Sequence, residues 1–355
     1  MDFTRHGGHG VFQLDVSIAI VKMLQFEDIE SAQAAIATYV HRTPLVRSET
    51  LSRRWNTQVY LKLECLQKTG SFKPRGAFNK LLSLVASHRA GELKVVGVSG
   101  GNHAQGLAYA SRILGIKATI CMPETTPSNY LDATRSYGAD IRLLPNIHAA
   151  FREASQMQDL GWTYVHPFDD PLVAAGQGTI ALEILEDLPD VTHCYVSIGG
   201  GGLISGIATG LKRNPRLEVA LSNPTQSPRI IGVETIGADC MWQAVQAGRI
   251  VEIPAITSIA RTLGSPSASP MTFTLVKELV DELLVVSDAE CIQELFLVLE
   301  RCKILVEPAA ACCLAAAERH SATFRPEDHV VILLCGGNVS ASDLVGWHSQ
   351  RKYHH

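Results

Sequence analysis

The stretch Gly70-Ser71-Phe72-Lys73-Pro74-Arg75-Gly76 places a lysine between two glycines and directly before a proline. The residue before a proline avoids helical geometry, whereas proline itself suits the first turn of a helix. Lys73 is therefore predicted at a loop-to-helix junction. A lysine in a polar loop is usually a solvated charge, so the interpretation of Lys73 depends on the motifs around it.

Around this stretch, apolar and β-branched runs alternate with helical segments. The predicted strands are residues 59–63, 95–98, 118–121, 194–198, 230–233 and 330–334. Most of them are continuously apolar, which is typical of parallel strands covered on both faces. The segments between them carry small and apolar residues at helical spacing, and residues 26–39 form a further amphipathic pattern. This alternation predicts an α/β fold of doubly wound, mostly parallel sheets.

Four of the predicted strands run into glycine-rich turns. These turns are residues 70–76, 99–102, 199–202 and 336–338. In parallel α/β sheets, ligands bind outside the carboxyl ends of the strands. We therefore expect the four turns to share one crevice.

The turn at residues 199–202, called the tetraglycine turn below, consists of four successive glycines before a predicted helix. Bare backbone amides at a helix N-terminus suit a phosphate, and close packing alone seldom requires four glycines. A competing interpretation is a dinucleotide fingerprint, because Gly200, Gly202 and Gly206 approximate its spacing and Glu234 closes the next strand. A hydride-transfer site does not need Lys73, whereas an aldehyde cofactor with a phosphate tail needs both a lysine and a phosphate turn.

The run from Ser99 to Gly106 brings backbone amides and short polar side chains to a helix start, which suits a small carboxylate. Simple helix capping is the alternative, but one residue would suffice for that. His103 alone is weak support for a site. Cys335 follows an apolar strand directly, and a lone buried cysteine is usually a small hydrophobic residue.

Composition limits the classes of protein to be considered. The 355 residues suggest two domains, and 46% hydrophobic against 19% charged residues can bury substantial cores. A net charge of −4 without a basic block predicts no nucleic-acid partner. No apolar run is long enough to cross a bilayer, and the N-terminus lacks a signal-peptide core, so we expect no membrane partner and a cytoplasmic location. Nine scattered cysteines without zinc or Cys-x-x-Cys spacing predict neither disulfides nor structural zinc.

Taken together, these motifs resemble the fold-type II pyridoxal-phosphate family of serine and threonine dehydratases, with animal-type serine dehydratases the most similar branch. The match runs from about residue 26 to residue 345 and includes, in order, residues 43–45, 70–76, 99–106, 199–202, 307–309 and 335–338. The resemblance implies that pyridoxal 5′-phosphate lies in a cleft between two domains. It implies a discontinuous large domain of residues 1–93 and 172–355, with residues 1–20 disordered, and a small substrate-closing domain of residues 94–171.

The resemblance also implies residue roles. The implied cofactor contacts are Lys73 for covalent attachment, Phe72 and Asn102 beside the ring and its hydroxyl, Gly199, Gly200, Gly201, Gly202 and Leu203 around the phosphate, and Cys335 and Gly336 near the pyridine nitrogen. The implied substrate contacts are Ser71, Ser99, Gly100, Asn102 and His103. A thiol opposite the pyridine nitrogen leaves that nitrogen unprotonated and favours loss of a β-substituent.

Further expectations follow from the same family. A monovalent or divalent cation is expected near Glu234, the Ala238 carbonyl and Cys240, and a homodimer is the common assembly. Serine racemases of the family carry a serine where this chain has Gly100, so racemization is not expected. Tyr130 stands where many relatives carry a lysine. No segment after residue 345 corresponds to the regulatory domain of biosynthetic threonine dehydratases, so feedback control of that kind is not expected.

The predicted reaction is elimination from a β-hydroxy amino acid such as L-serine or L-threonine. Lys73 is displaced from the cofactor by the substrate amine and then removes the Cα proton. The β-hydroxyl leaves, and hydrolysis gives a 2-oxo acid and ammonia. The alternatives are a β-replacement enzyme of cysteine-synthase type, a dehydratase for bulkier substrates such as 3-hydroxyaspartate or phenylserine, a nicotinamide-dependent oxidoreductase and a catalytically silent metabolite sensor.

Overall fold

The computed structural model describes residues 23–89, 91–215 and 227–349, which form two separate β-sheets. The six-stranded sheet has the order β1-β2-β10-β7-β8-β9, with β1 Leu45–Arg47, β2 Gln58–Lys62, β7 His193–Ser197, β8 Arg229–Thr235, β9 Glu282–Val286 and β10 His329–Leu333. The four-stranded sheet has the order β5-β4-β3-β6, with β3 Lys94–Val98, β4 Lys117–Pro123, β5 Asp140–Leu144 and β6 Thr163–Tyr164. Among these described strands, only β1 pairs antiparallel, with β2. The predicted α/β class with mostly parallel sheets is confirmed.

Helices follow most of the strands and cover the sheets. They are α1 Phe26–Ile36, α2 Glu49–Trp55, α3 Lys73–Ser87, α4 Asn102–Ile113, α5 Ser128–Ser136, α6 Ile147–Asp159, α7 Pro171–Asp187, α8 Gly202–Lys212, α10 Cys240–Ala247, α11 Pro270–Leu279, α12 Asp288–Leu297, α13 Pro308–His320 and α14 Ala341–His348. In the six-stranded sheet, α13 packs along β7 to β10, and α8 packs on β7 and against α7. Such two-sided cover explains why these strands are apolar almost throughout.

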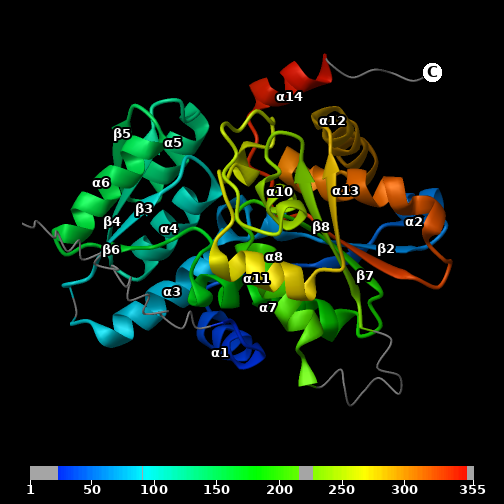
Figure 1. Cartoon of the computed structure of the whole chain (residues 1–355), viewed down its shortest axis with the longest axis horizontal. Helices are drawn as coiled ribbons and strands as arrows, with labels where there is room; N and C mark the ends of the chain where they lie inside the picture. Colours follow the sequence, from blue (N-terminus) through cyan, green and yellow to red (C-terminus); the bar gives the residue numbers. More distant parts are fainter. Residues whose placement is uncertain (1–22, 90, 216–226, 350–355) are drawn as a thin grey trace, which may run out of the picture.

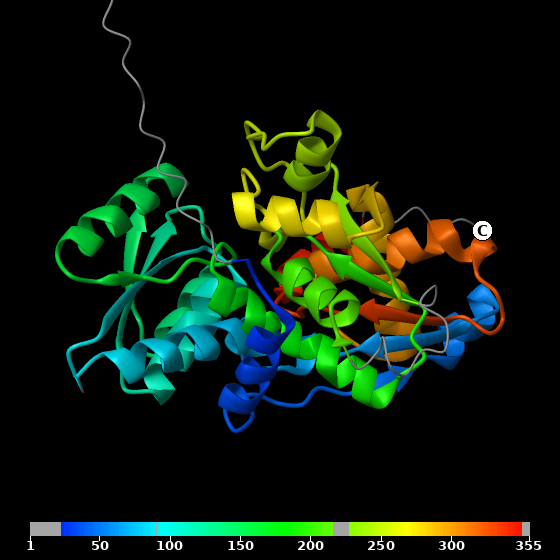
Figure 2. The same ribbon diagram turned by 60° about the horizontal axis from the view of Figure 1, so that its bottom comes forward.

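The two sheets lie in two lobes joined along α3 and α7 (Figures 1 and 2). The four-stranded sheet and helices α4, α5 and α6 form the smaller lobe, on the left of Figure 1. Helix α3 falls within the predicted large domain, yet it contributes Ala77, Phe78 and Leu81 to the core of the smaller lobe. The exact boundaries at residues 94 and 171 therefore stay a prediction, and the expected disorder of residues 1–20 lies outside the described residues.

The order of the strands determines where the glycine-rich turns meet. Strand β10 lies between β2 and β7, with Val330 paired to both Val59 and His193. Because these strands are parallel, the turns that follow β2, β7 and β10 leave the same edge of the sheet. The candidate site is therefore expected at this edge, opposite the turn that follows β3 in the smaller lobe.

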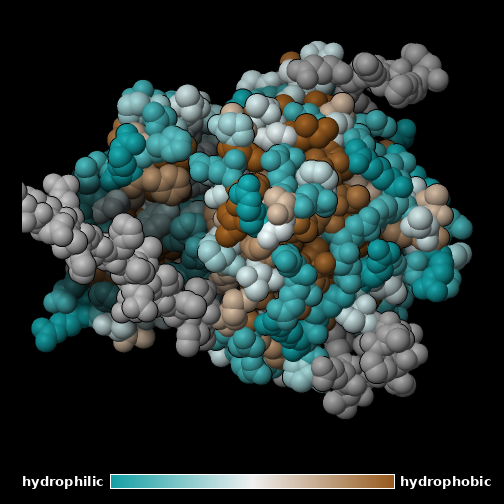
Figure 3. Space-filling model, in the orientation of Figure 1, coloured by the Kyte–Doolittle hydropathy of each residue, from teal (hydrophilic) through white to brown (hydrophobic). Residues whose placement is uncertain are grey.

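The surface is mixed in character. On the face shown in Figure 3, hydrophobic side chains gather mainly over the larger lobe. Within the described residues, no helix is both long and apolar enough to span a bilayer.

Candidate active site

Lys73 is the first residue of α3, as the sequence predicted. The chain reaches it through a tight turn in which Thr69 and Gly70 have φ angles of 64° and 70°. The Nζ atom of Lys73 donates a hydrogen bond to the Pro167 carbonyl oxygen at 2.9 Å. Burial lowers the pKa of Lys73 to about 8. A substantial fraction of this amine is therefore neutral near physiological pH, as a nucleophile or a general base must be.

The start of α3 is held by a buried ionic network that involves Arg75. Its guanidinium donates to Glu64 Oε1 at 2.8 Å and Oε2 at 2.9 Å, and to Glu183 Oε1 at 2.6 Å and Oε2 at 2.9 Å. Lys62 Nζ lies 2.6 Å from Glu183 Oε2. Arg75, Lys62 and Glu64 are completely buried. Because Arg75 is two residues from Lys73, this network fixes the helix end that carries the amine.

Three of the four glycine-rich turns meet beside Lys73. Gly337 N donates to Gly70 O at 2.9 Å, and Phe72 N donates to Cys335 O at 3.1 Å. Asn338 Nδ2 donates to Asn102 Oδ1 at 2.8 Å, which joins the turn after β10 to the start of α4. The predicted shared crevice is therefore present for these turns.

The tetraglycine turn lies beside the same crevice. It ends at the N-terminus of α8, and Gly201 has a φ of 96°, which favours glycine. A Cβ added at Gly200 would lie 2.2 Å from the Phe168 ring, and one at Gly202 would lie 2.9 Å from Phe168. Only bare backbone fits there. Phe168 follows Pro167, the acceptor of the Lys73 amine, so residues 167 and 168 connect the lysine with the glycines. Leu203 is buried behind the turn.

The turn before α4 offers donors for a small anion. Ser99 Oγ accepts a hydrogen bond from Gly101 N at 3.1 Å. A Cβ added at Gly100 would lie 2.8 Å from Thr126 Oγ1. The hydroxyls of Thr126 and Ser71 are buried and have no hydrogen-bond partner within the described part of the chain. Buried unpaired hydroxyls at a concave site are available to a ligand.

His103 and Cys335 are both buried and uncharged. The Nε2 atom of His103 lies 3.0 Å from the Val165 carbonyl, and burial lowers the pKa of His103 to about 3. A substrate contact from His103 would therefore come from its backbone amide in the first turn of α4. Burial raises the pKa of the Cys335 thiol well above its ordinary value. Cys335 and Gly336 adjoin the Lys73 loop, where Ser71 and Gly336 form an isolated β-bridge.

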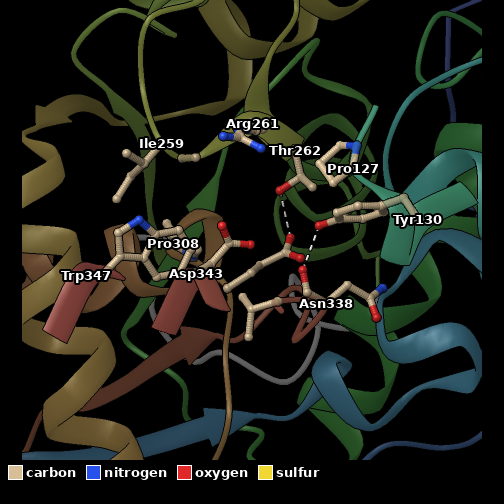
Figure 4. Close-up of a pocket in the computed structure, with 12 residues that line it drawn as sticks. Pro127, Tyr130, Ile259, Arg261, Thr262, Pro308, Asn338, Asp343 and Trp347 are labelled. Atoms are coloured by element: carbon tan, nitrogen blue, oxygen red, sulfur yellow. Dashed lines mark hydrogen bonds between the residues drawn. The ribbon is translucent and has the colours of Figure 1, made fainter. Parts of the chain in front are cut away.

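A pocket opens next to this crevice, between α5 and the larger lobe (Figure 4). Its lining residues are Pro127, Tyr130, Ile259, Ala260, Arg261, Thr262, Glu307, Pro308, Asn338, Val339, Asp343 and Trp347. Tyr130 Oη donates a hydrogen bond to the Asn338 carbonyl at 2.6 Å, which links the two lobes. The tyrosine that departs from the family pattern thus supplies a contact across the cleft.

Comparison with known proteins identifies the family. A family model described as pyridoxal-phosphate dependent enzyme matches residues 36–336. The chain belongs to this family. It is 40% identical to L-threonine ammonia-lyase of Geobacter sulfurreducens over 91% of this chain and 77% of that protein. It is 39% identical to the catabolic L-threonine dehydratase TdcB of Staphylococcus aureus strain N315, over 93% of this chain and 94% of that protein.

Solved structures agree with this assignment. Maize serine racemase superposes with a TM-score of 0.82 at 32% identity, covering 92% of this chain and 98% of that chain. A bacterial threonine deaminase, from T.th., superposes with a TM-score of 0.80 at 37% identity, covering 89% of this chain and 99% of that chain. The resemblance to fold-type II serine and threonine dehydratases is confirmed, and the nicotinamide alternative is wrong. Glu234, its ribose-binding candidate, instead accepts hydrogen bonds from Met241 N at 3.0 Å and Trp242 N at 2.6 Å.

The residues present fit pyridoxal phosphate. A bare-backbone turn at a helix N-terminus suits its phosphate, and an amine with a lowered pKa suits its aldehyde. We expect the rate of cofactor uptake by cofactor-free protein to rise with pH around the Lys73 pKa of about 8, because only the neutral amine attacks the aldehyde. An ordinary lysine would give a rise toward its usual pKa of 10.5. Stopped-flow absorbance across this range measures the midpoint, and a midpoint near that ordinary value would contradict the lowered pKa.

Several residues of the site were not predicted from the sequence. Pro167 and Phe168 were not singled out, although they follow β6 as the other turns follow their strands. Glu307 was part of a matched motif without an assigned role, and Thr262 had none. Glu307 Oε1 accepts from Asn102 Nδ2 at 2.9 Å and from Thr262 Oγ1 at 2.8 Å. The signal that could have found Glu307 is an acidic residue directly before a helix-starting proline in an otherwise apolar run.

Proposed function

We propose that the chain catalyses the pyridoxal-phosphate-dependent elimination of water from L-threonine or L-serine, with release of a 2-oxo acid and ammonia. The observation that carries this proposal is the Lys73 amine, whose pKa burial lowers to about 8, at the meeting point of three ligand-binding turns. The names of the relatives point to the same chemistry. The bound cofactor supplies the electron-withdrawing ring that makes the Cα proton removable.

The roles of the chain's own residues follow from their positions. Lys73 Nζ holds the cofactor and later takes the Cα proton, and the Pro167 carbonyl, 2.9 Å away, orients the freed amine. The Ser99 to Asn102 turn binds the substrate carboxylate through backbone amides, with the unpaired hydroxyls of Ser71 and Thr126 as further donors. The tetraglycine turn holds the phosphate. Asn102 and Cys335 contact the ring.

The test is a comparison of substrates with purified holoenzyme. We expect 2-oxo acid and ammonia in equal amounts from L-threonine and L-serine, with kcat/KM at least about tenfold higher than for 3-hydroxyaspartate or phenylserine. The adjoining pocket carries the carboxyl groups of Glu307 and Asp343 against one guanidinium, Arg261, which disfavours a second substrate carboxylate. Absence of 2-oxo acid from every substrate would refute the proposal.

Two other activities are separated by the same assay. Added sulfide should not divert the product to cysteine, as it would in a β-replacement enzyme. D-serine should not accumulate, because Gly100 has no side chain to carry a proton, and a Cβ there would crowd Thr126 Oγ1 at 2.8 Å. Formation of either product would change the assignment.

We further propose a monovalent cation beside the tetraglycine turn, near Glu234, the Ala238 carbonyl and Cys240. Glu234 is 1% exposed, and burial raises its pKa to about 8. Cys240 Sγ lies 3.9 Å from Gly199 O. No cluster of three His, Cys, Asp or Glu side chains occurs in residues 23–89, 91–215 and 227–349, so main-chain carbonyls would complete the coordination.

The cation proposal predicts a specific ion effect on stability. Replacing potassium by tetramethylammonium at equal ionic strength should lower Tm by about 2–4 °C, because a bound ion stabilises only the folded state. The variant Glu234→Gln should lose this difference. Differential scanning calorimetry measures both, and equal Tm values in the two salts for the unmodified chain would contradict the site.

We also propose a cytoplasmic homodimer. Leu66 and Leu305 are 57% and 41% exposed. They lie on either side of Gly337, whose position for a Cβ is 3.3 Å from Cys65 Cβ and 2.9 Å from Leu305 O. Large exposed apolar side chains gathered in one place favour an interface. Light scattering should give twice the chain mass, and Leu66→Glu should lower it. A wild-type monomer would contradict the dimer.

A further inference from the structure

Glu307 is a buried carboxyl group at the centre of the site. It immediately precedes α13 and is 2% exposed. Its backbone N–H donates to Gly336 O at 3.0 Å, which ties it to the turn after β10. Its side chain makes no capping hydrogen bond to α13. Helix capping therefore does not account for a carboxyl group in this place.

The side chain of Glu307 is directed instead at Asn102 and Thr262. Oε1 accepts from Asn102 Nδ2 at 2.9 Å and from Thr262 Oγ1 at 2.8 Å. Oε2 is buried and has no hydrogen-bond partner among the described residues. Burial raises the pKa of Glu307, while hydrogen bonds from Thr262 and Asn102 and the charge of Lys73 lower it. Burying a carboxyl group in this way is costly, which argues for a role in ligand binding.

The amide orientation of Asn102 is determined from two sides. An oxygen of Glu307 that already accepts from Thr262 requires a donor, so Asn102 turns Nδ2 toward it. On the other side, Asn338 Nδ2 donates to Asn102 Oδ1 at 2.8 Å. Asn102 Oδ1 is thereby occupied, and one of the two Nδ2 hydrogens is used by Glu307. The second Nδ2 hydrogen is left for a ligand.

We propose that Glu307 is a positioning residue for the cofactor: it holds the Asn102 amide so that the second Nδ2 hydrogen donates to the ring hydroxyl oxygen of pyridoxal phosphate. Glu307 does not touch the cofactor in this role and acts through Asn102. A donor facing the ring oxygen favours its deprotonated form. The inference rests on the proposed function and on the contact between Asn102 and the ring.

The experiment is a double-mutant cycle on Glu307 and Asn102, with the cofactor itself as the probe. The variants are Glu307→Gln, Glu307→Ala, Asn102→Ala and the two double variants. Equilibrium dialysis gives the dissociation constant of pyridoxal phosphate, and a pH titration of the holoenzyme gives the visible absorbance band. Glu294→Gln is the matched control, because Glu294 is also a buried carboxyl group but pairs with Arg54 at 3.2 Å, away from the site.

We expect Glu307→Ala to weaken cofactor binding about tenfold, the effect of losing one hydrogen bond to a charged group, and to shift the visible band or its pH midpoint. Glu307→Gln should lie between Glu307→Ala and the unmodified chain, because its amide oxygen still accepts from Asn102. Adding either Glu307 substitution to Asn102→Ala should cause little further loss, since both act through one contact. Glu294→Gln should leave the spectrum unchanged.

Two results would overturn the inference: wild-type affinity and spectrum in both Glu307 variants, or full additivity with Asn102→Ala. The Glu307→Gln cycle decides the question even if Glu307→Ala fails to fold. Failure of the unmodified chain to bind pyridoxal phosphate would instead refute the proposed function, so the two failures are distinguishable.

Discussion

Replacing Lys73 with alanine is expected to lower kcat/KM for 2-oxo acid release from threonine and serine by about 10⁴-fold or more, because the cofactor's attachment point and the Cα base are lost together. Lys73 Nζ lies at the meeting point of the ligand-binding turns and donates to Pro167 O at 2.9 Å. Borohydride reduction followed by mass spectrometry should add the cofactor mass to the unmodified chain and not to Lys73→Ala. Ammonia release measured in single turnovers gives the rate.

Lys80→Ala is the matched control for this prediction. Lys80 lies on the same helix and forms an ion pair with Asp170 at 2.6 Å. Its loss removes one partly buried ion pair and leaves the amine of the active site in place. Activity within a few-fold of the unmodified chain is expected. If Lys73→Ala retained full ammonia release, the proposed mechanism would be wrong, whereas equal losses in both variants would indicate damage to α3.

The sequence allowed the fold to be predicted where one pattern dominated. The apolar runs at residues 59–63 and 330–334 correspond to β2 Gln58–Lys62 and β10 His329–Leu333, each displaced by one residue. These strands are covered on both faces, so burial leaves a continuous apolar signature. The glycine-rich turns were equally clear, because bare backbone is needed where chain segments approach closely.

Four strands were missed for physical reasons. Strand β5 Asp140–Leu144 is a partly exposed edge strand with charged residues, and β6 Thr163–Tyr164 has only two residues. Strand β1 Leu45–Arg47 is a short antiparallel edge. Strand β9 Glu282–Val286 follows α11 after only two residues, so its apolar run reads as more of the helix. Edge strands need less burial, and their patterns are correspondingly weak.

The residues missed at the site depend on long-range contacts. Glu307 reaches Asn102, 205 positions away, only because β10 lies between β2 and β7. Pro167 reaches Lys73 across 94 positions. Local patterns contain no information on such pairs. The chemistry of single motifs was therefore predictable, while the residues that orient them required the tertiary structure.

Replacing Arg75 with methionine is expected to lower the free energy of unfolding by about 3–5 kcal/mol, the usual cost of leaving buried carboxylates without a partner. Arg75 donates to both Glu64 and Glu183, and the three side chains lie in the interior beneath Lys73. Lys62 still pairs with Glu183 at 2.6 Å, so the uncompensated charge would fall mainly on Glu64. Urea unfolding followed by fluorescence measures the loss.

Two comparisons separate charge from packing. Arg42→Ala removes an exposed ion pair with Asp187, 2.7 Å long, and should cost no more than about 1 kcal/mol. The double variant Arg75→Met, Glu64→Gln removes the uncompensated charge and should recover part of the stability lost in Arg75→Met, because neighbouring sites are coupled. Arg75→Met no less stable than Arg42→Ala would refute the argument for a buried network. A double variant no more stable than Arg75→Met would assign the loss to packing, and the network would then hold Lys73 by shape and not by charge.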